Sequence, residues 1–158
     1  MNNISKDLSK AIQDAIVILD EVKQDRITKR TKRWNEKEIL GHLIDSAINN
    51  YSRFIRGYKS QKLVFDGYDQ DLWVDRQDYN RIDWKDIVAT WKNVNYLILN
   101  LLSTYEQKEL LLKIDQHNFG DITFKKVPND QPIGLEYLIR DYIDHLNHHI
   151  AQIQELNG

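Results

Sequence analysis

Four long segments of the chain repeat apolar residues at the three- and four-residue spacing of an amphipathic helix. They extend from about Ser5 to Val22, Asn35 to Tyr58, Asp83 to Tyr105 and Gly134 to Leu156. Residues at this spacing share one helix face, which is buried against a neighbour. Strand signal is weak elsewhere, so the pattern predicts an all-α four-helix bundle formed as one domain over residues 1–158.

Two of these segments carry residues that typically begin or end helices. Asn35 can cap the second helix, and Glu38 three residues later completes the pattern of a capping box. Pro132 stands near the start of the fourth helix and Gly158 follows its end. The second and fourth helices are therefore the best delimited.

Long connections are expected after the second and third helices. Residues 60–81 show no sustained period and contain a turn signal at Asp66-Gly67, while residues 106–131 are mixed and include a predicted short strand at 122–124. A connection as long as the first is usually functional or packed over a site. We expect part of it to form a pocket rim, through Tyr68, Asp69, Asp71 and Trp73.

The composition indicates a protein without disulfides and without a strong preference for polyanions. The 158 residues include no cysteine, 22 basic and 24 acidic residues, with a formal net charge of −2. No segment approaches the roughly 20 apolar residues of a membrane span, and no signal peptide is visible. We expect a cytoplasmic protein that binds neither membranes nor nucleic acid, and interpret the basic run at 29–33 as a solvated loop.

Three of the five histidines lie close together in the fourth helix. His145 and His149 are four residues apart and share one face, at the edge of the apolar stripe, whereas His148 is rotated by about 60° from His145 and points away. This spacing suits two imidazoles that bind one metal ion. The same pair is also compatible with surface histidines near a helix C-terminus, where positive charge is favourable. His117 is isolated, and we assign it no role.

The second helix offers a third histidine within a line of polar side chains. This line spans about 60° of the helix circumference, and consists of His42, Asp45, Ser46, Asn49, Arg53 and Arg56. It forms either a solvated face, which the angle alone favours, or a polar groove inside the bundle. The opposite face is apolar over an unusual width, which predicts a second partner and hence a homodimer.

Two motifs in this chain resemble those of one protein family. Residues 34–45, WNEKEILGHLID, and residues 141–153, DYIDHLNHHIAQI, are similar to the second-helix and last-helix signatures of the DinB/YfiT-like metalloenzymes. The resemblance covers nearly the whole chain. It implies a four-helix bundle, often dimeric, that holds one divalent metal ion on His42, His145 and His149, with His148 outside the ligand set.

Such a centre leaves one coordination position open for water or substrate. Imidazole ligands suit zinc or nickel, with iron as a third candidate. Asp141 precedes His145 by one turn and Asp45 follows His42 by one turn, so both are candidates to orient the imidazoles. Further candidates to line the pocket are Asn49, Arg53 and Gln152.

Three functions are consistent with this centre. The first is a transferase that acts on a small-molecule substrate with an external low-molecular-weight thiol, since the chain has no thiol of its own. The second is a hydrolase that uses metal-activated water. The third is a bundle without catalytic activity that stores or senses metal, or serves as an interaction module.

Overall fold

Four long helices form the bundle in this computed structural model, which describes residues 1–158. Short helices occupy the connections, and no strand is formed; only two isolated bridges join extended residues. This confirms the predicted all-α four-helix bundle. The helices are α1 (Asn3–Glu21), α2 (Glu36–Gly57), α3 (Gln70–Gln77), α4 (Trp84–Ser103), α5 (Gln107–Leu110), α6 (Phe119–Ile122) and α7 (Leu135–Asn157).

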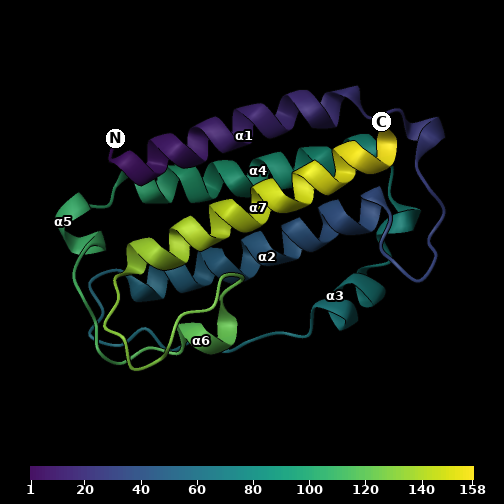
Figure 1. Cartoon of the computed structure of the whole chain (residues 1–158). Coiled ribbons are helices and arrows are strands. Elements are labelled where there is room, and N and C mark those ends of the chain that lie inside the picture. Colours follow the sequence, from purple (N-terminus) through teal and green to yellow (C-terminus); the bar gives the residue numbers. More distant parts are fainter.

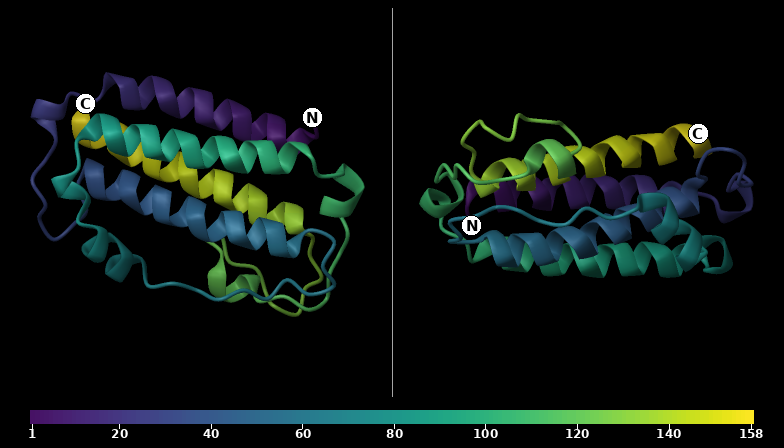
Figure 2. Two further views of the ribbon diagram at one scale, coloured as in Figure 1. Left: turned by 180° about the vertical axis from the view of Figure 1, so that it is seen from behind. Right: turned by 90° about the horizontal axis from the view of Figure 1, so that it is seen from below.

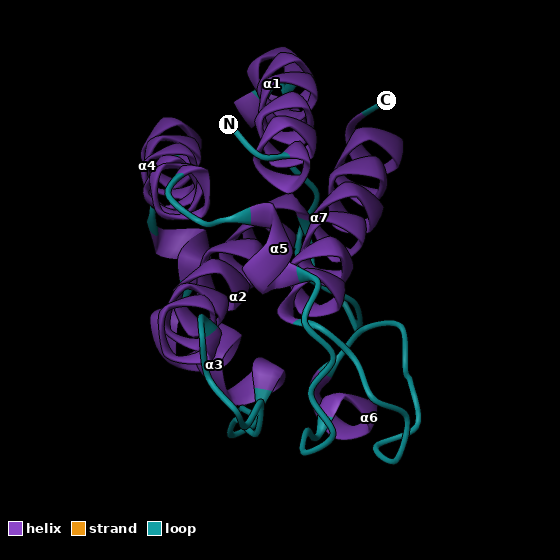
Figure 3. Ribbon diagram, turned by 90° about the vertical axis from the view of Figure 1, so that its left-hand side faces the viewer, coloured by secondary structure: helices purple, strands orange, loops and turns teal.

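In two cases, long helices that follow each other in the chain lie diagonally opposite in the bundle. Both α1 and α2 pack against α4 and α7, which places α1 opposite α2 and α4 opposite α7 (Figure 3). The neighbours α2 and α4 run in the same direction, as do α1 and α7 (Figure 1). Parallel neighbours cannot be joined by a tight turn, so the chain needs the long connection that the sequence predicted between α2 and α4.

The second helix begins as its capping pattern predicts. The Asn35 side chain accepts a hydrogen bond from the Glu38 backbone N–H, and the Glu38 carboxylate accepts one from the Asn35 N–H. These reciprocal bonds satisfy backbone donors that a helix end otherwise leaves unpaired. They also fix the first turns of α2, which carry His42.

Two neighbours within the same chain cover most of the broad apolar face of α2. Leu40, Leu43 and Phe54 are buried in the common core beneath α4 and α7. Two isoleucines of this helix stay outside the core, Ile48 at 44% exposure and Ile55 at 47%. The homodimer remains a prediction.

The two long connections contain more helix than expected. Residues 60–81 hold α3 and a 3-10 turn at 79–81, and Figure 2 shows this connection running back along the outside of the bundle. The predicted strand at 122–124 is wrong, because Ile122 ends α6 and the next residues lack a partner strand. Phe124 and Lys125 instead donate their backbone N–H groups to the Asp141 carboxylate. No helix of the structure is long and apolar enough to cross a membrane.

Candidate metal centre

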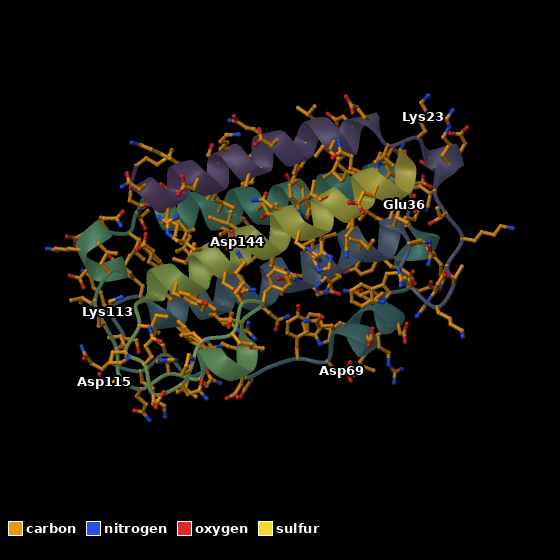
Figure 4. All side chains as sticks on the ribbon, in the orientation of Figure 1. Lys23, Glu36, Asp69, Lys113, Asp115 and Asp144 are labelled. Carbon is orange, nitrogen blue, oxygen red and sulfur yellow. The ribbon has the colours of Figure 1, made fainter.

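Three imidazoles from α2 and α7 meet between these helices. The Nε2 atoms of His42 and His145 are 3.0 Å apart, and those of His145 and His149 are 3.1 Å apart. The candidate donor atoms of all three lie within 4.8 Å of one another. The rings of each pair stand nearly perpendicular, and one nitrogen of each ring is close enough to the others to bind a single ion. In Figure 4, the neighbouring Asp144 is labelled on α7, and Glu36 marks the start of α2.

The nitrogen spacing fits a metal ion. Zinc binds histidine nitrogen at about 2.0–2.1 Å in tetrahedral sites, which separates neighbouring ligand nitrogens by about 3.3 Å. The two observed separations are close to this value. The three nitrogens also come from two helices, so packing of the whole bundle holds them together.

The electrostatics of the site keep the imidazoles neutral, as metal ligands must be. Burial, together with the smaller effect of the neighbouring imidazoles, lowers the pKa of His42 and of His145 to about 3. Burial also lowers the pKa of His149. Burial therefore favours the neutral form of all three rings.

Gln152 fixes the tautomer of one ligand candidate. Its Oε1 lies 2.7 Å from His149 Nδ1, so Nδ1–H donates to the amide oxygen and the Nε2 lone pair faces the centre. The sequence placed Gln152 near the pocket, and the structure shows that it contacts a histidine directly. By contrast, His42 Nδ1 is buried with no hydrogen-bond partner.

His148 lies outside the histidine cluster, although it follows the same helix. Its ring is exposed and receives a hydrogen bond from the Gln152 amide at 3.3 Å. The Phe124 ring lies 5.3 Å from the His145 ring and 5.1 Å from the His148 ring between centroids, and the His148 ring lies 5.0 Å from that of His149 without joining the set of convergent nitrogens. The structure thus separates the adjacent histidines as the helical angles predict.

A cavity of about 310 Å³ opens beside the cluster, between α2, α7 and the two long connections. On the α2 side it is lined by Ser46, Asn50 and Arg53, and on the α7 side by residues that include His145 and His149. The polar line of α2 is buried at His42, Asp45, Ser46 and Arg53 and becomes exposed at Arg56. Most of that line therefore faces a groove inside the bundle, and the solvated-face interpretation is wrong.

Neither candidate carboxylate makes a hydrogen bond to an imidazole. Asp45 accepts one from the Tyr79 hydroxyl at 2.6 Å, and burial raises its pKa to about 6. Asp141 accepts two from the Phe124 and Lys125 amides, which ties the connection at 119–134 to α7. Asp45 thus holds the segment before α4 in place. Asp141 holds residues 119–134, which cover the cavity and are called its roof below.

The other pocket candidates divide between the cavity and its surroundings. Arg53 lines the cavity, whereas the Asn49 side chain donates to the Asp45 carbonyl of its own helix and is not part of the lining. Tyr68 alone of the expected rim residues reaches the cavity, and Trp73 packs against the Tyr68 ring. Asp69 caps α3, and Asp71 lies in its first turn.

Sequence reasoning missed several residues around the centre. Phe124 and Lys126 belong to the roof, Asn50 and Tyr142 to the walls. The Trp34 ring covers His42 at 4.8 Å between centroids. Nothing in the local sequence marks Phe124 or Lys126, because the fold of the connection places them; Trp34 stands within the second-helix motif, which was the available signal.

A helical bundle with three convergent histidine nitrogens beside a polar cavity defines a metal-binding class of four-helix proteins. The YfiT structure from Bacillus subtilis, described as "a probable metal-dependent hydrolase with an unusual four-helix bundle topology", matches this fold with a TM-score of 0.74. It is 20% identical, and the match covers 99% of this chain and 87% of that one.

Relatives identified by sequence are also described as metal-dependent hydrolases. A "putative metal-dependent hydrolase" of Halalkalibacterium halodurans is 26% identical over 142 residues, which cover 88% of this chain and 74% of the relative. YfiT of Bacillus subtilis, with the same description, is 23% identical over 98% of this chain and 80% of its own length. No protein-family model matches the chain. These relatives and the shared fold support the resemblance to DinB/YfiT-like proteins that the two motifs indicated.

Proposed function

We propose that this protein is a metal-dependent enzyme, and specifically a transferase that joins a low-molecular-weight thiol to an electrophilic substrate. The ion, zinc or nickel with iron as a third candidate, is assigned to the Nε2 atoms of His42, His145 and His149. The observation that carries the proposal is the convergence of these nitrogens beside a cavity of about 310 Å³. A divalent ion with three imidazole ligands supplies an open coordination position and lowers the pKa of a thiol or water bound there.

The reaction is a nucleophilic substitution, R–SH + R′–X → R–S–R′ + X⁻ + H⁺. The S–H and R′–X bonds break, the S–R′ bond forms, and the proton passes to solvent. The thiol comes from outside because the chain has no cysteine. Asp141 accepts hydrogen bonds from two backbone amides, and Asp45, whose Oδ2 has no hydrogen-bond partner, does not line the cavity, so neither carboxylate is offered as a base. Thiols ionise far more readily than water, which favours a thiol nucleophile at this site.

The test combines metal analysis with a thiol-transfer assay. Protein purified without an affinity tag is expected to contain one divalent ion per chain and to conjugate thiols with chlorodinitrobenzene. Treatment with a chelator should abolish the enzymatic rate, and adding metal back should restore it. Equal rates with and without metal, across a panel of cellular thiols, would rule out the proposal.

A hydrolase is the second candidate, because the curated relatives are described as metal-dependent hydrolases. One feature of the structure also favours it: His148 is exposed and lines the cavity without belonging to the cluster, so its imidazole can accept a proton from water. Ester, amide and phosphoester panels should then show turnover that depends on metal and falls in His148→Ala. The absence of turnover with several metals would count against hydrolysis.

A further inference from the structure

The guanidinium of Arg53 is buried beside the cavity without an acidic partner. This residue is 4% exposed, yet it takes part in none of the ion pairs of the structure. It donates hydrogen bonds to the Asp66 carbonyl at 2.7 Å and to Asn50 Oδ1 at 3.4 Å. A buried cation normally has a paired anion, because its transfer from water is costly.

The nearby Asp66 carboxylate is exposed to solvent and forms no ion pair with Arg53, although its charge favours the protonated guanidinium. Burial raises the pKa of Tyr68 to about 12, so its phenol is neutral. The Asp141 carboxylate is bonded to the two amides of the roof. Lys126 and Asp121 also line the cavity, and Lys126 Nζ donates to the Asp121 carbonyl, so these two charges offset each other. The Arg53 guanidinium is thus left as a buried positive charge that an anionic ligand would balance.

The distance between the two ends of the cavity sets the size of such a ligand. Ser46 and Arg53 line the same wall seven positions apart, which corresponds to about 10 Å along α2 at 1.5 Å per residue. The histidine cluster lies at the Ser46 end, where His145 and His149 join the lining. A ligand that contacts both ends must be an elongated small molecule.

We propose that Arg53 is a substrate-binding residue that takes the carboxylate or phosphate of an elongated anionic ligand, whose other end reaches the three-histidine centre. This rests on the proposed function for the role of the histidine end, but not for the role of Arg53. A guanidinium is suited to either oxyanion, because its N–H donors match two oxygens at once. The anionic group thus selects and orients the ligand, while the histidine end carries the chemistry.

The first experiment tests the anion site without metal. Isothermal titration measures binding of adipate and of inorganic phosphate to the chelator-treated protein, which distinguishes a carboxylate from a phosphate ligand. The variant is Arg53→Gln, with Arg56→Gln as the matched control, since Arg56 is exposed on the same helix, outside the cavity lining, and contacts Ser52 and the Phe65 ring. Arg53→Lys keeps the charge and checks that any loss is not a failure to fold, as does circular dichroism of each variant.

The second experiment tests both ends together. Zinc-loaded protein is titrated with 6-mercaptohexanoate and with 6-mercaptohexanol, which differ only in the terminal carboxylate. Wild type is expected to bind the acid about tenfold or more tightly than the alcohol, as one charge-assisted pair permits. Arg53→Gln should lose this preference while it keeps its metal and its affinity for the alcohol, and Arg56→Gln should behave as wild type.

The outcomes separate this proposal from the proposed function. If neither anion binds metal-free wild type and the acid has no advantage over the alcohol, Arg53 serves only to hold the Asp66 carbonyl and the proposal is overturned. A preference that persists in Arg53→Gln overturns it as well. If anions bind through Arg53 but neither thiol binds the zinc-loaded protein, the anion site stands and the thiol transferase fails.

Discussion

Alanine replacements of the four histidines near the centre should distinguish the three metal ligands from the one histidine that does not bind the ion. His42→Ala, His145→Ala and His149→Ala each remove a convergent Nε2 atom, whereas His148→Ala removes an exposed ring outside the cluster. Wild type and His148→Ala are expected to retain one ion per chain after dialysis. The other three variants should retain far less, since two protein ligands remain.

The expected stability change follows from mass action. An ion bound only by the folded state at 100 times its dissociation constant adds about 2.7 kcal/mol. A chain of 158 residues has an unfolding entropy of about 0.33 kcal/mol/K, from roughly 2.1 cal/mol/K per residue. The ion should therefore raise Tm by about 8 °C. For His148→Ala the change should be within about 0.5 kcal/mol, as for most surface substitutions.

The assay measures each variant twice, with metal and with chelator, by elemental analysis and thermal unfolding. The difference between the two conditions isolates the contribution of the ion from the packing lost with the side chain. Loss of the ion in His148→Ala with retention in His145→Ala would refute the ligand assignment on α7. Retention in His42→Ala would refute the third ligand.

Three further predictions concern the frame of the site. Gly41→Ala should lower stability by about 1–3 kcal/mol in urea unfolding, because a Cβ there would lie 2.0 Å from the Tyr79 ring, and this overlap outweighs the better helix propensity of alanine; a stabilised variant would contradict the overlap. Asp141→Asn should cost about 1–3 kcal/mol, because one amide of the roof loses its carboxylate acceptor, and protease cleavage within 119–134 should accelerate, whereas Asp144→Asn affects only an exposed ion pair and should leave both unchanged. The metal-free protein should lose stability as pH falls from about 6.5 toward about 3, because the folded-state pKa of His42 lies near 3 and the unfolded chain binds more protons in that window; urea midpoints should fall less steeply in His42→Gln, and an equal slope would exclude His42 as a contributor.

The sequence alone provided stronger grounds for His145 and His149, which share α7, than for His42 on α2. His145 and His149 are adjacent on α7 because four residues make about one turn, which requires no knowledge of the rest of the fold. His42 lies in a polar line whose angle on α2 is the same whether solvent or another helix faces it. Only the motif resemblance pointed to His42, and only the packing of α2 against α7 shows that it is buried.

The connections were the least predictable part of the chain. Their N–H groups find partners set by tertiary contacts, as at Phe124 and Lys125, whose acceptor Asp141 lies 17 and 16 residues away. Local periodicity therefore suggested a strand where a carboxylate on α7 satisfies the backbone. The partner of Asp45 was hidden for the same reason, since Tyr79 is 34 residues distant.

The position of the histidines along the chain determines when the centre can exist during synthesis. His42 and His145 are 103 positions apart, and the second comes from the last helix of the bundle. At about 5–20 residues per second, the ribosome delivers α7 roughly 5–20 seconds after α2. During this interval no pair of ligands is in place, so a nascent chain lacks the convergent histidine set that would hold an ion. An ion held by all three histidines therefore requires that α7 has already docked against α2.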